Sequence, residues 1–344
     1  MSSVLSTITT QFQKSPYLLS SLIAVPLFAF AMPLFGGNKF PVKGRLVVIT
    51  GGSQGMGKSV AILLAKKGAN VAIIARDQRK LDLALEEIKA AAADPETQKF
   101  LAVSADMTDH AEVKRAYDEI NAWGGCPDVS WSIAGSSTPG YFKDMSPTQL
   151  ESQMRTNYFS TMHCAHAALN LMTTAPNKPT YPRQLVFTSS VVAFYTFTGY
   201  APYAPAKAAI RSLADSLRQE CILYDINVSC CFPATILTPG FEAEELIKPE
   251  LTKILEGSDE GQTPDQVAKV CVKKLEEGQF LITTNFIGSL MRAASFGGSM
   301  RNNLLWDTIM AWVLNFVWWF VRPIMDMDVH KYKKTKGVPP PGSK

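Results

Sequence analysis

The chain has 344 residues, of which 47% are hydrophobic and 19% charged, and its formal net charge is +4. This length can bury a large core, and the composition is slightly rich in apolar residues for a soluble protein. The mild positive charge, with no basic stripe interleaved with aromatic residues, argues against a nucleic-acid-binding protein.

An uncharged apolar stretch, YLLSSLIAVPLFAFAMPLF, covers residues 17–35. As a helix it would be about 28 Å long, which is enough to cross the hydrocarbon core of a membrane. A cleaved signal peptide is the alternative, but the run is long for one and no clear small-residue cleavage site follows it. The heavier basic flank, at Lys39 and Lys43, lies on the C-terminal side, so the main body is expected in the cytosol. We therefore expect residues 1–40 to be a membrane anchor.

The first strand of the main body, LVVIT at residues 46–50, runs into the loop TGGSQGMGKS. From Gly52 this loop matches the phosphate loop G-x-x-x-x-G-K-S of NTPases, and from Thr50 it matches the dinucleotide loop T-G-x-x-x-G-x-G. Both motifs bring backbone N–H groups and a helix N-terminus against phosphate. The loop alone therefore predicts a nucleotide site without saying which nucleotide.

The second expected strand, NVAIIAR, ends at Arg76, 19 positions beyond Gly57. In dinucleotide-binding folds an acidic residue here binds the ribose of NAD, whereas an arginine accepts the 2′-phosphate of NADP. Arg76, Lys80 and the Ser53 hydroxyl together predict a phosphate pocket and therefore NADPH as the cofactor. The alternative is that Arg76 is only a solvated charge at a strand end.

The middle of the chain alternates expected strands with helical patterns. Further strands are predicted at FLAVSAD, DVSWSIAG, RQLVFTSS and INVSCCFPA. Strands that alternate with helices imply right-handed crossovers and a parallel sheet. We expect an α/β fold with a doubly wound, Rossmann-type parallel sheet, forming a catalytic domain over residues 41–280. Ligands of such sheets bind beyond the carboxyl ends of the strands.

The motif Tyr203-Ala-Pro-Ala-Lys207 places two side chains one helical turn apart on one face. A nearby ammonium group favours the phenolate and lowers the pKa of the tyrosine, which suits proton donation to a developing alkoxide. The TSS sequence lies 13 residues upstream, at Ser190. Because neighbouring strand residues face opposite ways, only one of Ser189 and Ser190 can point at the substrate, and we favour Ser190. This combination favours a dehydrogenase over an NTPase.

The C-terminal region contains LLWDTIMAWVLNFVWWFVRPIM at residues 304–325, an apolar and aromatic stretch. A single membrane span, a re-entrant hairpin with residues 280–295, an interfacial helix and a helix docked on the core all fit it. We expect residues 281–328 to be membrane-associated. The basic, proline-rich residues 329–344 are expected to form a disordered tail.

Two further patterns predict no additional site. The six cysteines show neither C-x-x-C pairs nor metal spacing, so we expect them to be reduced and mostly buried. His163 and His166 have helical spacing but no evident third ligand, and no metal is expected.

Taken together, the motifs resemble the short-chain dehydrogenase/reductase family over roughly residues 44–278. The resemblance implies an oxidoreductase whose catalytic tetrad is Asn157, Ser190, Tyr203 and Lys207, with Asn157 supporting a proton-relay water. It also implies that Asp106 contacts adenine and that Ile236 lies near the nicotinamide carboxamide. The implied cofactor-binding residues are Gly51, Ser53, Gln54, Gly55, Gly57, Arg76, Lys80, Asp106, Tyr203, Lys207 and Ile236. Ser132, Ile133 and Ala234 depart from the family pattern without touching the proton-transfer groups.

The loop context and the apolar ends are similar to a branch of the family that reduces 3-ketosphinganine to sphinganine in sphingolipid synthesis. That resemblance implies a long-chain sphingoid ketone as substrate, the cytosolic face of the endoplasmic reticulum membrane as location, and a homo-oligomer. A membrane-bound reductase of 3-ketoacyl-CoA or of steroid ketones is the alternative within the family. A non-catalytic nucleotide-binding scaffold is the alternative outside it, and a complete tetrad argues against that.

Two segments are expected to shape the substrate site. Residues 241–261 lie where the family has its substrate lid, and an acidic residue there, Glu242, Glu244 or Glu245, would meet the amine of a sphingoid substrate. Three aromatic residues between the serine and the tyrosine either line an apolar channel or belong to the core. These are Phe194, Tyr195 and Phe197.

Overall fold

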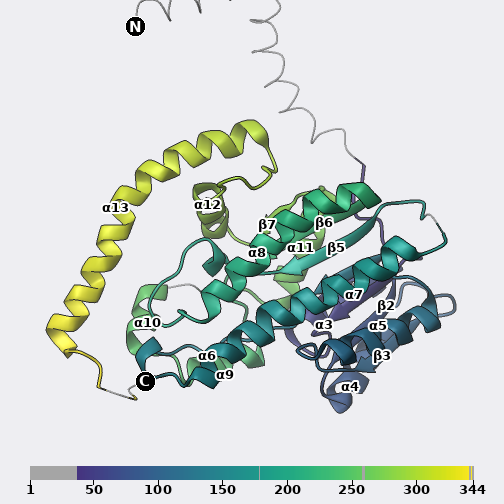
Figure 1. Cartoon of the computed structure of the whole chain (residues 1–344), viewed down its shortest axis with the longest axis horizontal. Coiled ribbons are helices and arrows are strands. Elements are labelled where there is room, and N and C mark those ends of the chain that lie inside the picture. Colours follow the sequence, from purple (N-terminus) through teal and green to yellow (C-terminus); the bar gives the residue numbers. More distant parts are fainter. Residues whose placement is uncertain (1–36, 178, 258–259, 341, 343–344) are drawn as a thin grey trace, which may run out of the picture.

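A computed structural model describes residues 37–177, 179–257, 260–340 and 342. The predicted N-terminal anchor lies almost entirely outside these residues. The centre of the molecule is a sheet of seven parallel strands in the order β3-β2-β1-β4-β5-β6-β7 (Figure 1). The doubly wound, Rossmann-type sheet predicted from the alternation of strands and helices is therefore confirmed.

Six of the strands coincide with the predicted apolar runs. The strands are β1 (Leu46–Thr50), β2 (Asn70–Ala75), β3 (Phe100–Ser104), β4 (Val129–Ser132), β5 (Arg183–Thr188), β6 (Ile226–Phe232) and β7 (Leu281–Thr283). The last strand was not predicted, because three residues are too few to show a periodicity. It extends the sheet beyond β6 through the pairs that begin at Cys230 and Leu281.

Helices cover both faces of the sheet, because successive strand residues point to opposite sides. On one face Val47 and Ile49 pack under α3 (Gly55–Lys66), α4 (Gln78–Ala90) and α11 (Pro264–Glu276). On the other face Val48 packs under α5 (His110–Gly124), α7 (Ser160–Thr174) and α8 (Tyr203–Glu220). The sheet is thus buried on both sides, as its nearly continuous apolar strands require.

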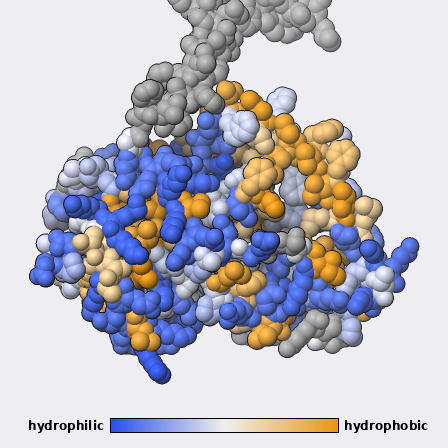
Figure 2. Space-filling view, turned by 180° about the vertical axis from the view of Figure 1, so that it is seen from behind, coloured by the Kyte–Doolittle hydropathy of each residue, from blue (hydrophilic) through white to orange (hydrophobic). Residues whose placement is uncertain are grey.

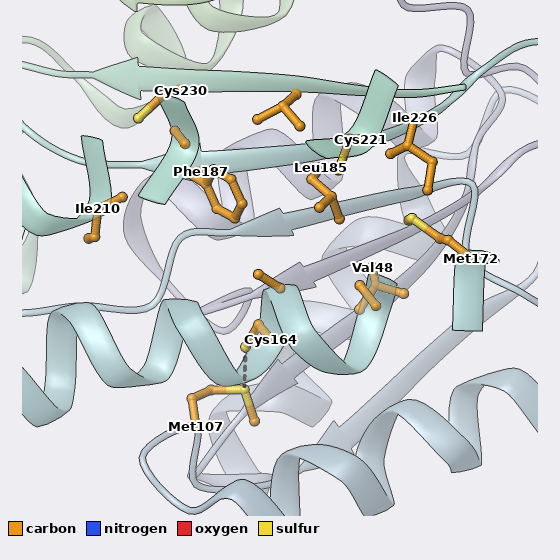
Figure 3. Packing of buried hydrophobic residues seen from close by; sticks show 14 of the residues in the cluster. Val48, Met107, Cys164, Met172, Leu185, Phe187, Ile210, Cys221, Ile226 and Cys230 are labelled. Atoms are coloured by element: carbon orange, nitrogen blue, oxygen red, sulfur yellow. Dashed lines mark hydrogen bonds between the residues drawn. The ribbon is translucent and has the colours of Figure 1, made fainter. Parts of the chain in front are cut away.

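The core under α7 and α8 is a close-packed mixture of aliphatic, aromatic and sulfur-containing side chains (Figure 3). Phe187 on β5 and Cys230 on β6 lie together in it, and the thiol of Cys164 contacts the Met107 sulfur at 3.5 Å. All six cysteines are free, and all but Cys126 are buried, which confirms the expectation of reduced, mostly buried thiols. Burial raises the pKa of the Cys164 thiol to about 12, so this thiol is inert packing.

Smaller helices follow the carboxyl ends of the later strands. They are α6 (Pro147–Gln153), α9 (Pro239–Glu245), α10 (Glu250–Glu256) and α12 (Phe286–Ala294). Helices α9 and α10 occupy the segment predicted to be the substrate lid.

The last helix, α13 (Leu304–Lys336), arches away from the sheet and returns toward α10 (Figure 1). The expectation of a disordered tail over residues 329–344 is therefore wrong up to Lys336, because α13 continues through that part of it. Asn303 caps the first turn of α13 by accepting a hydrogen bond from the Trp306 N–H at 2.9 Å. Buried Asp307 fixes its base: its carboxylate pairs with Arg292 of α12 at 3.1 Å and accepts the N–H of Asn302 at 2.9 Å. Among the described helices, α13 alone is long and apolar enough to cross a membrane.

Candidate active site

A cavity of about 680 Å³ lies beyond the carboxyl ends of the strands. It begins at the glycine-rich loop after β1, passes the ends of β4 and β5, and reaches α9, α10 and the inner side of α13. One continuous space therefore joins the predicted nucleotide site to the predicted lid and to the C-terminal helix.

The glycine-rich loop is closely packed, so that α3 starts directly under the cavity. A Cβ atom on Gly57 would lie 2.1 Å from the Gly51 carbonyl oxygen, and Gly51 itself has a φ of +70°. The Thr50 hydroxyl accepts the N–H of Ile133 at 3.1 Å, which ties this loop to the end of β4. The N-cap residue of α3, Gln54, makes no side-chain cap, which leaves the first N–H groups of this helix available to an anion.

The lysine of the G-K-S sequence points away from this loop. Lys58 points to α4, where its ammonium group pairs with the Glu87 carboxylate at 2.9 Å, and it does not line the cavity. In a phosphate-loop NTPase this lysine reaches the phosphates. The position of Lys58 therefore argues against the NTPase interpretation.

The end of β2 carries the residues predicted to choose between NAD and NADP. Arg76 and Lys80 are exposed and line the cavity, together with Ser53. The acidic neighbour, Asp77, also lines it, but its carboxylate caps α4 by accepting the Lys80 N–H at 3.1 Å. Two cationic side chains thus border the cavity where a ribose phosphate is predicted.

Tyr203 and Lys207 both line the cavity from the first turn of α8. The Lys207 ammonium lies 5.5 Å from the centre of the Tyr203 ring and donates to the Thr188 carbonyl oxygen at 3.2 Å. Burial lowers the pKa of Lys207 to about 8. Burial also raises the pKa of Tyr203, as does the Glu244 carboxylate, whereas a hydrogen bond with Ser190 lowers it. The expectation of a lowered tyrosine pKa is therefore wrong, because burial and the Glu244 carboxylate raise this pKa more than the Ser190 hydrogen bond lowers it.

The two candidate serines at the end of β5 have different partners. The Ser189 hydroxyl is buried and donates to the Lys207 carbonyl oxygen at 2.7 Å, so it holds α8 against the strand. The Ser190 hydroxyl interacts with Tyr203 and lies 3.4 Å from the Pro233 carbonyl oxygen. Ser190 is thus the serine whose hydroxyl shares the environment of the phenol, as favoured from the strand alternation.

Asn157 lies behind the cavity wall rather than in it. It belongs to a single π-helical turn, Met154–Phe159, and such turns are frequent at functional sites. Its amide donates to the carbonyl oxygens of Ser136 and Gln153, each at 2.9 Å, and its buried Oδ1 has no hydrogen-bond partner among the described residues. A Cβ atom on Gly135 would lie 2.7 Å from that oxygen and 3.3 Å from the Lys207 ammonium. Asn157 and Lys207 thus approach the same glycine.

The other residues expected in the tetrad or in cofactor binding all line the cavity. Asp106 is held by Thr108, whose N–H and hydroxyl both lie 2.9 Å from its carboxylate. Ile236 is held by a bridge to Gln262. The remaining members are Gly51, Gln54, Gly55 and Gly57.

Of the three aromatic residues after the serines, two line the cavity and one packs in the core. Tyr195 and Phe197 line the cavity. Phe194 packs in the core instead, with its ring centre 4.4 Å from that of Phe232. The Tyr195 ring stacks on Trp318 of α13 at 4.8 Å, so the C-terminal helix closes this end of the cavity.

Several residues of the site had no sequence signal. Trp318, Val321 and Met325 line the cavity from α13, although they lie more than 100 residues beyond Tyr203. Tyr200 and Glu256 line it from the segment before α8 and from α10. No motif marks these positions, because only the path of the chain brings them to the site.

The chain belongs to the short-chain dehydrogenase family, whose model matches residues 45–246. It is therefore an oxidoreductase by family. Among curated relatives it is 44% identical to 3-ketodihydrosphingosine reductase ksrA of Aspergillus fumigatus, a match covering 89% of each chain. It is also 39% identical to 3-ketodihydrosphingosine reductase gsl-3 of Neurospora crassa, over 92% of this chain and 90% of the relative.

Solved structures share the fold at lower identity. Levodione reductase aligns with a TM-score of 0.64 at 20% identity, covering 73% of this chain and 99% of the other. A short-chain dehydrogenase from Burkholderia phymatum in complex with NAD aligns with a TM-score of 0.62 at 20% identity, covering 72% and 90%.

Proposed function

We propose that this protein reduces 3-ketosphinganine to sphinganine with NADPH. The observation that carries the proposal is a single cavity that joins the glycine-rich loop, the Ser190–Tyr203–Lys207 group and an apolar chamber under α13. The relatives named above are 3-ketodihydrosphingosine reductases matched over most of their length, which supports the choice of substrate.

The proposed chemistry assigns one task to each polar group. A bound reduced nicotinamide supplies the hydride that the ketone carbon accepts. Tyr203 gives its phenolic proton to the ketone oxygen, and the raised pKa keeps that proton in place until the alkoxide develops. Ser190 donates a hydrogen bond to the same oxygen, and Lys207 stabilises the charge left on the phenol. Asn157 holds the loop at Ser136 and supports the route by which the proton is replaced.

The residues of the nucleotide end fit a phosphorylated dinucleotide. The uncapped start of α3 and the close approach of Gly57 to Gly51 suit a pyrophosphate. Arg76 and Lys80 would hold a 2′-phosphate, and Asp77 is occupied as a helix cap.

We expect Arg76→Glu to reverse the cofactor preference. The ratio of kcat/KM for NADPH to that for NADH should fall by about 100-fold, because a charged hydrogen bond to phosphate is lost and repulsion is added. The matched control is Arg79→Glu, an exposed arginine one turn further on that does not line the cavity. If the ratio of kcat/KM for NADPH to that for NADH is the same in Arg76→Glu and Arg79→Glu, the assignment of Arg76 to the 2′-phosphate is refuted.

The alternative substrates, 3-ketoacyl-CoA and steroid ketones, fit the chamber less well. Its α13 wall is apolar, from Trp318, Val321 and Met325, and it suits a long alkyl chain. The polar groups at the lid end are carboxylates, Glu244 and Glu256. Carboxylates repel the phosphates of coenzyme A and have no partner on a steroid ketone.

We also propose that α13 lies in the plane of a membrane rather than across it. Its outward side carries large exposed side chains, including Trp312, which is 80% exposed, and Trp319, which is 74% exposed. In Figure 2 orange, hydrophobic side chains lie along much of this helix, with paler residues between them. Its inner side lines the cavity, and its last residue, Lys336, pairs with Glu250 of α10 at 3.2 Å. A helix that contacts the catalytic domain at both ends is placed to pass a lipid substrate from the bilayer to the cavity.

Depth measurements distinguish an in-plane helix from a membrane span. Environment-sensitive labels on cysteines introduced at positions 312 and 327 of the full chain are compared in vesicles containing lipid-bound quenchers at known depths. An in-plane helix predicts the same shallow depth for both labels. A span predicts depths that differ by about 20 Å, because the helix rises 1.5 Å per residue. The proposed membrane is that of the endoplasmic reticulum, with the catalytic domain on its cytosolic side.

A further inference from the structure

The lid end of the cavity contains a group of charged residues that the proposed chemistry does not use. Lys248, whose side chain is fully buried, pairs with the carboxylates of Glu244 at 3.3 Å and Glu256 at 2.7 Å, and also with Glu245. Lys253 adds a second contact to Glu245 at 3.4 Å. Three carboxylates thus face two ammonium groups, which leaves one net negative charge.

Tyr200 contacts two of these carboxylates but has only one proton to donate. Its hydroxyl lies 2.6 Å from a Glu244 carboxylate oxygen and 2.5 Å from one of Glu256. A phenol carries one proton and can donate to only one of these oxygens at a time. The other contact sets an oxygen lone pair against a carboxylate, and a further proton donor at that carboxylate would offset the repulsion.

A second buried polar group nearby also has no partner. The Thr252 hydroxyl is fully buried and makes no hydrogen bond among the described residues. It lies on α10, which begins after Lys248, one turn before Glu256, and it packs against Gly199, the neighbour of Tyr200. The charged group therefore has an excess of negative charge, and an unpartnered buried hydroxyl lies next to the residue before Tyr200, which is unusual for a purely structural cluster.

The position of this group relative to the reacting centre suits one ligand. Glu244 and Glu256 line the cavity, and the Tyr200 ring centre lies 5.9 Å from that of Tyr203. A sphingoid ketone carries its amine on the carbon next to the ketone carbon, so the amine must lie close to the oxygen that receives the Tyr203 proton. The carboxylates of Glu244 and Glu256 lie on the Tyr203 side of the cavity.

We propose that Glu244 and Glu256, held in place by Lys248 and Tyr200, bind the ammonium group of the substrate and select 2-amino ketones. The inference rests on the proposed function and adds to it the residues that recognise the polar head. Glu244, one of three acidic residues expected to meet the amine, remains a candidate, joined by Glu256 from α10. Glu242 is exposed and does not line the cavity.

The test compares two ketones that differ only in the amine. The full chain and its Glu244→Gln and Glu256→Gln variants are assayed with 3-ketosphinganine and with its desamino analogue, a hydroxy ketone of the same length. We expect kcat/KM for the amino ketone to fall in each variant at least about tenfold further than kcat/KM for the analogue, because any effect of Glu244 on the Tyr203 pKa acts on both ketones alike. Glu242→Gln, on the same helix as Glu244, is the matched control and should behave as the wild type with both ketones.

The other outcomes separate the inference from the proposed function. An equal fall for both ketones, or no change for either, overturns ammonium recognition while the reductase activity stands. A wild-type protein that binds NADPH but reduces neither ketone overturns the proposed function and the inference with it. Melting temperature and NADPH affinity are measured for each variant, and the use of two separate glutamates keeps the test decisive if one variant does not fold.

Discussion

Replacing Tyr203 by phenylalanine should abolish nearly all turnover while leaving the nucleotide site intact. The substitution removes only the phenolic oxygen, so the ring keeps its place between Lys207 and Tyr200. General acid catalysis contributes about 10²–10⁴-fold to such reactions, and we expect kcat to fall by that factor. The measurement is the rate of NADPH oxidation at saturating ketone, with NADPH affinity determined separately by equilibrium titration.

The control for this substitution is Tyr195→Phe. Tyr195 also lines the cavity, but its hydroxyl contacts the Met325 sulfur of α13 at 2.5 Å rather than the serines. Its loss should leave kcat within about fivefold, because a neutral hydrogen bond contributes only ~1 kcal/mol. Turnover that survives in Tyr203→Phe, or that falls equally in both variants, is incompatible with Tyr203 as the proton donor.

Gly57→Ala should remove cofactor binding by deforming the glycine-rich loop. The added Cβ would lie 2.1 Å from the Gly51 carbonyl oxygen and 2.7 Å from its carbon, so the backbone of one turn must move. Such overpacking lowers the free energy of unfolding by about 1–3 kcal/mol. The displaced N–H groups lose charged hydrogen bonds of about 1.5–3 kcal/mol each, so NADPH affinity should fall by about 100-fold.

A glycine in open space provides the comparison. Gly298 is exposed, has no heavy atom within 4 Å of an added Cβ and does not adopt a positive φ. Gly298→Ala should therefore keep its NADPH affinity and change stability by less than about 1 kcal/mol. Calorimetric titration and thermal unfolding measure both quantities. Normal NADPH binding in Gly57→Ala would mean that the loop does not hold the phosphates.

The parts of the site that could be predicted from the sequence are those set by local patterns. The strand LVVIT, the glycine spacing after it and the Tyr203–Lys207 pair each depend on residues a few positions apart. Helix and strand periodicities carry that information, and the parallel sheet then brings the strand ends together. The six longer strands were accordingly predicted from residue patterns, and the family from the resemblance of its motifs.

The remaining features depend on packing between distant segments. Tyr195 meets Trp318 only because α13 returns over the cavity, and Lys248 meets Glu256 only because α9 and α10 fold together. The tyrosine pKa was predicted in the wrong direction because spacing shows a neighbouring charge but not how deeply both groups are buried. Three-residue β7 shows no period at all.

In the proposed reaction, the ketone carbon of the sphingoid substrate accepts a hydride in this cavity while Tyr203 protonates the ketone oxygen. The most direct measurement uses the purified full chain with 3-ketosphinganine and NADPH deuterated at the transferable position. We predict sphinganine carrying one deuterium on its hydroxyl-bearing carbon from the wild type and almost none from Tyr203→Phe. Sphinganine without deuterium, or no sphinganine from a wild-type protein that binds NADPH, would contradict the account.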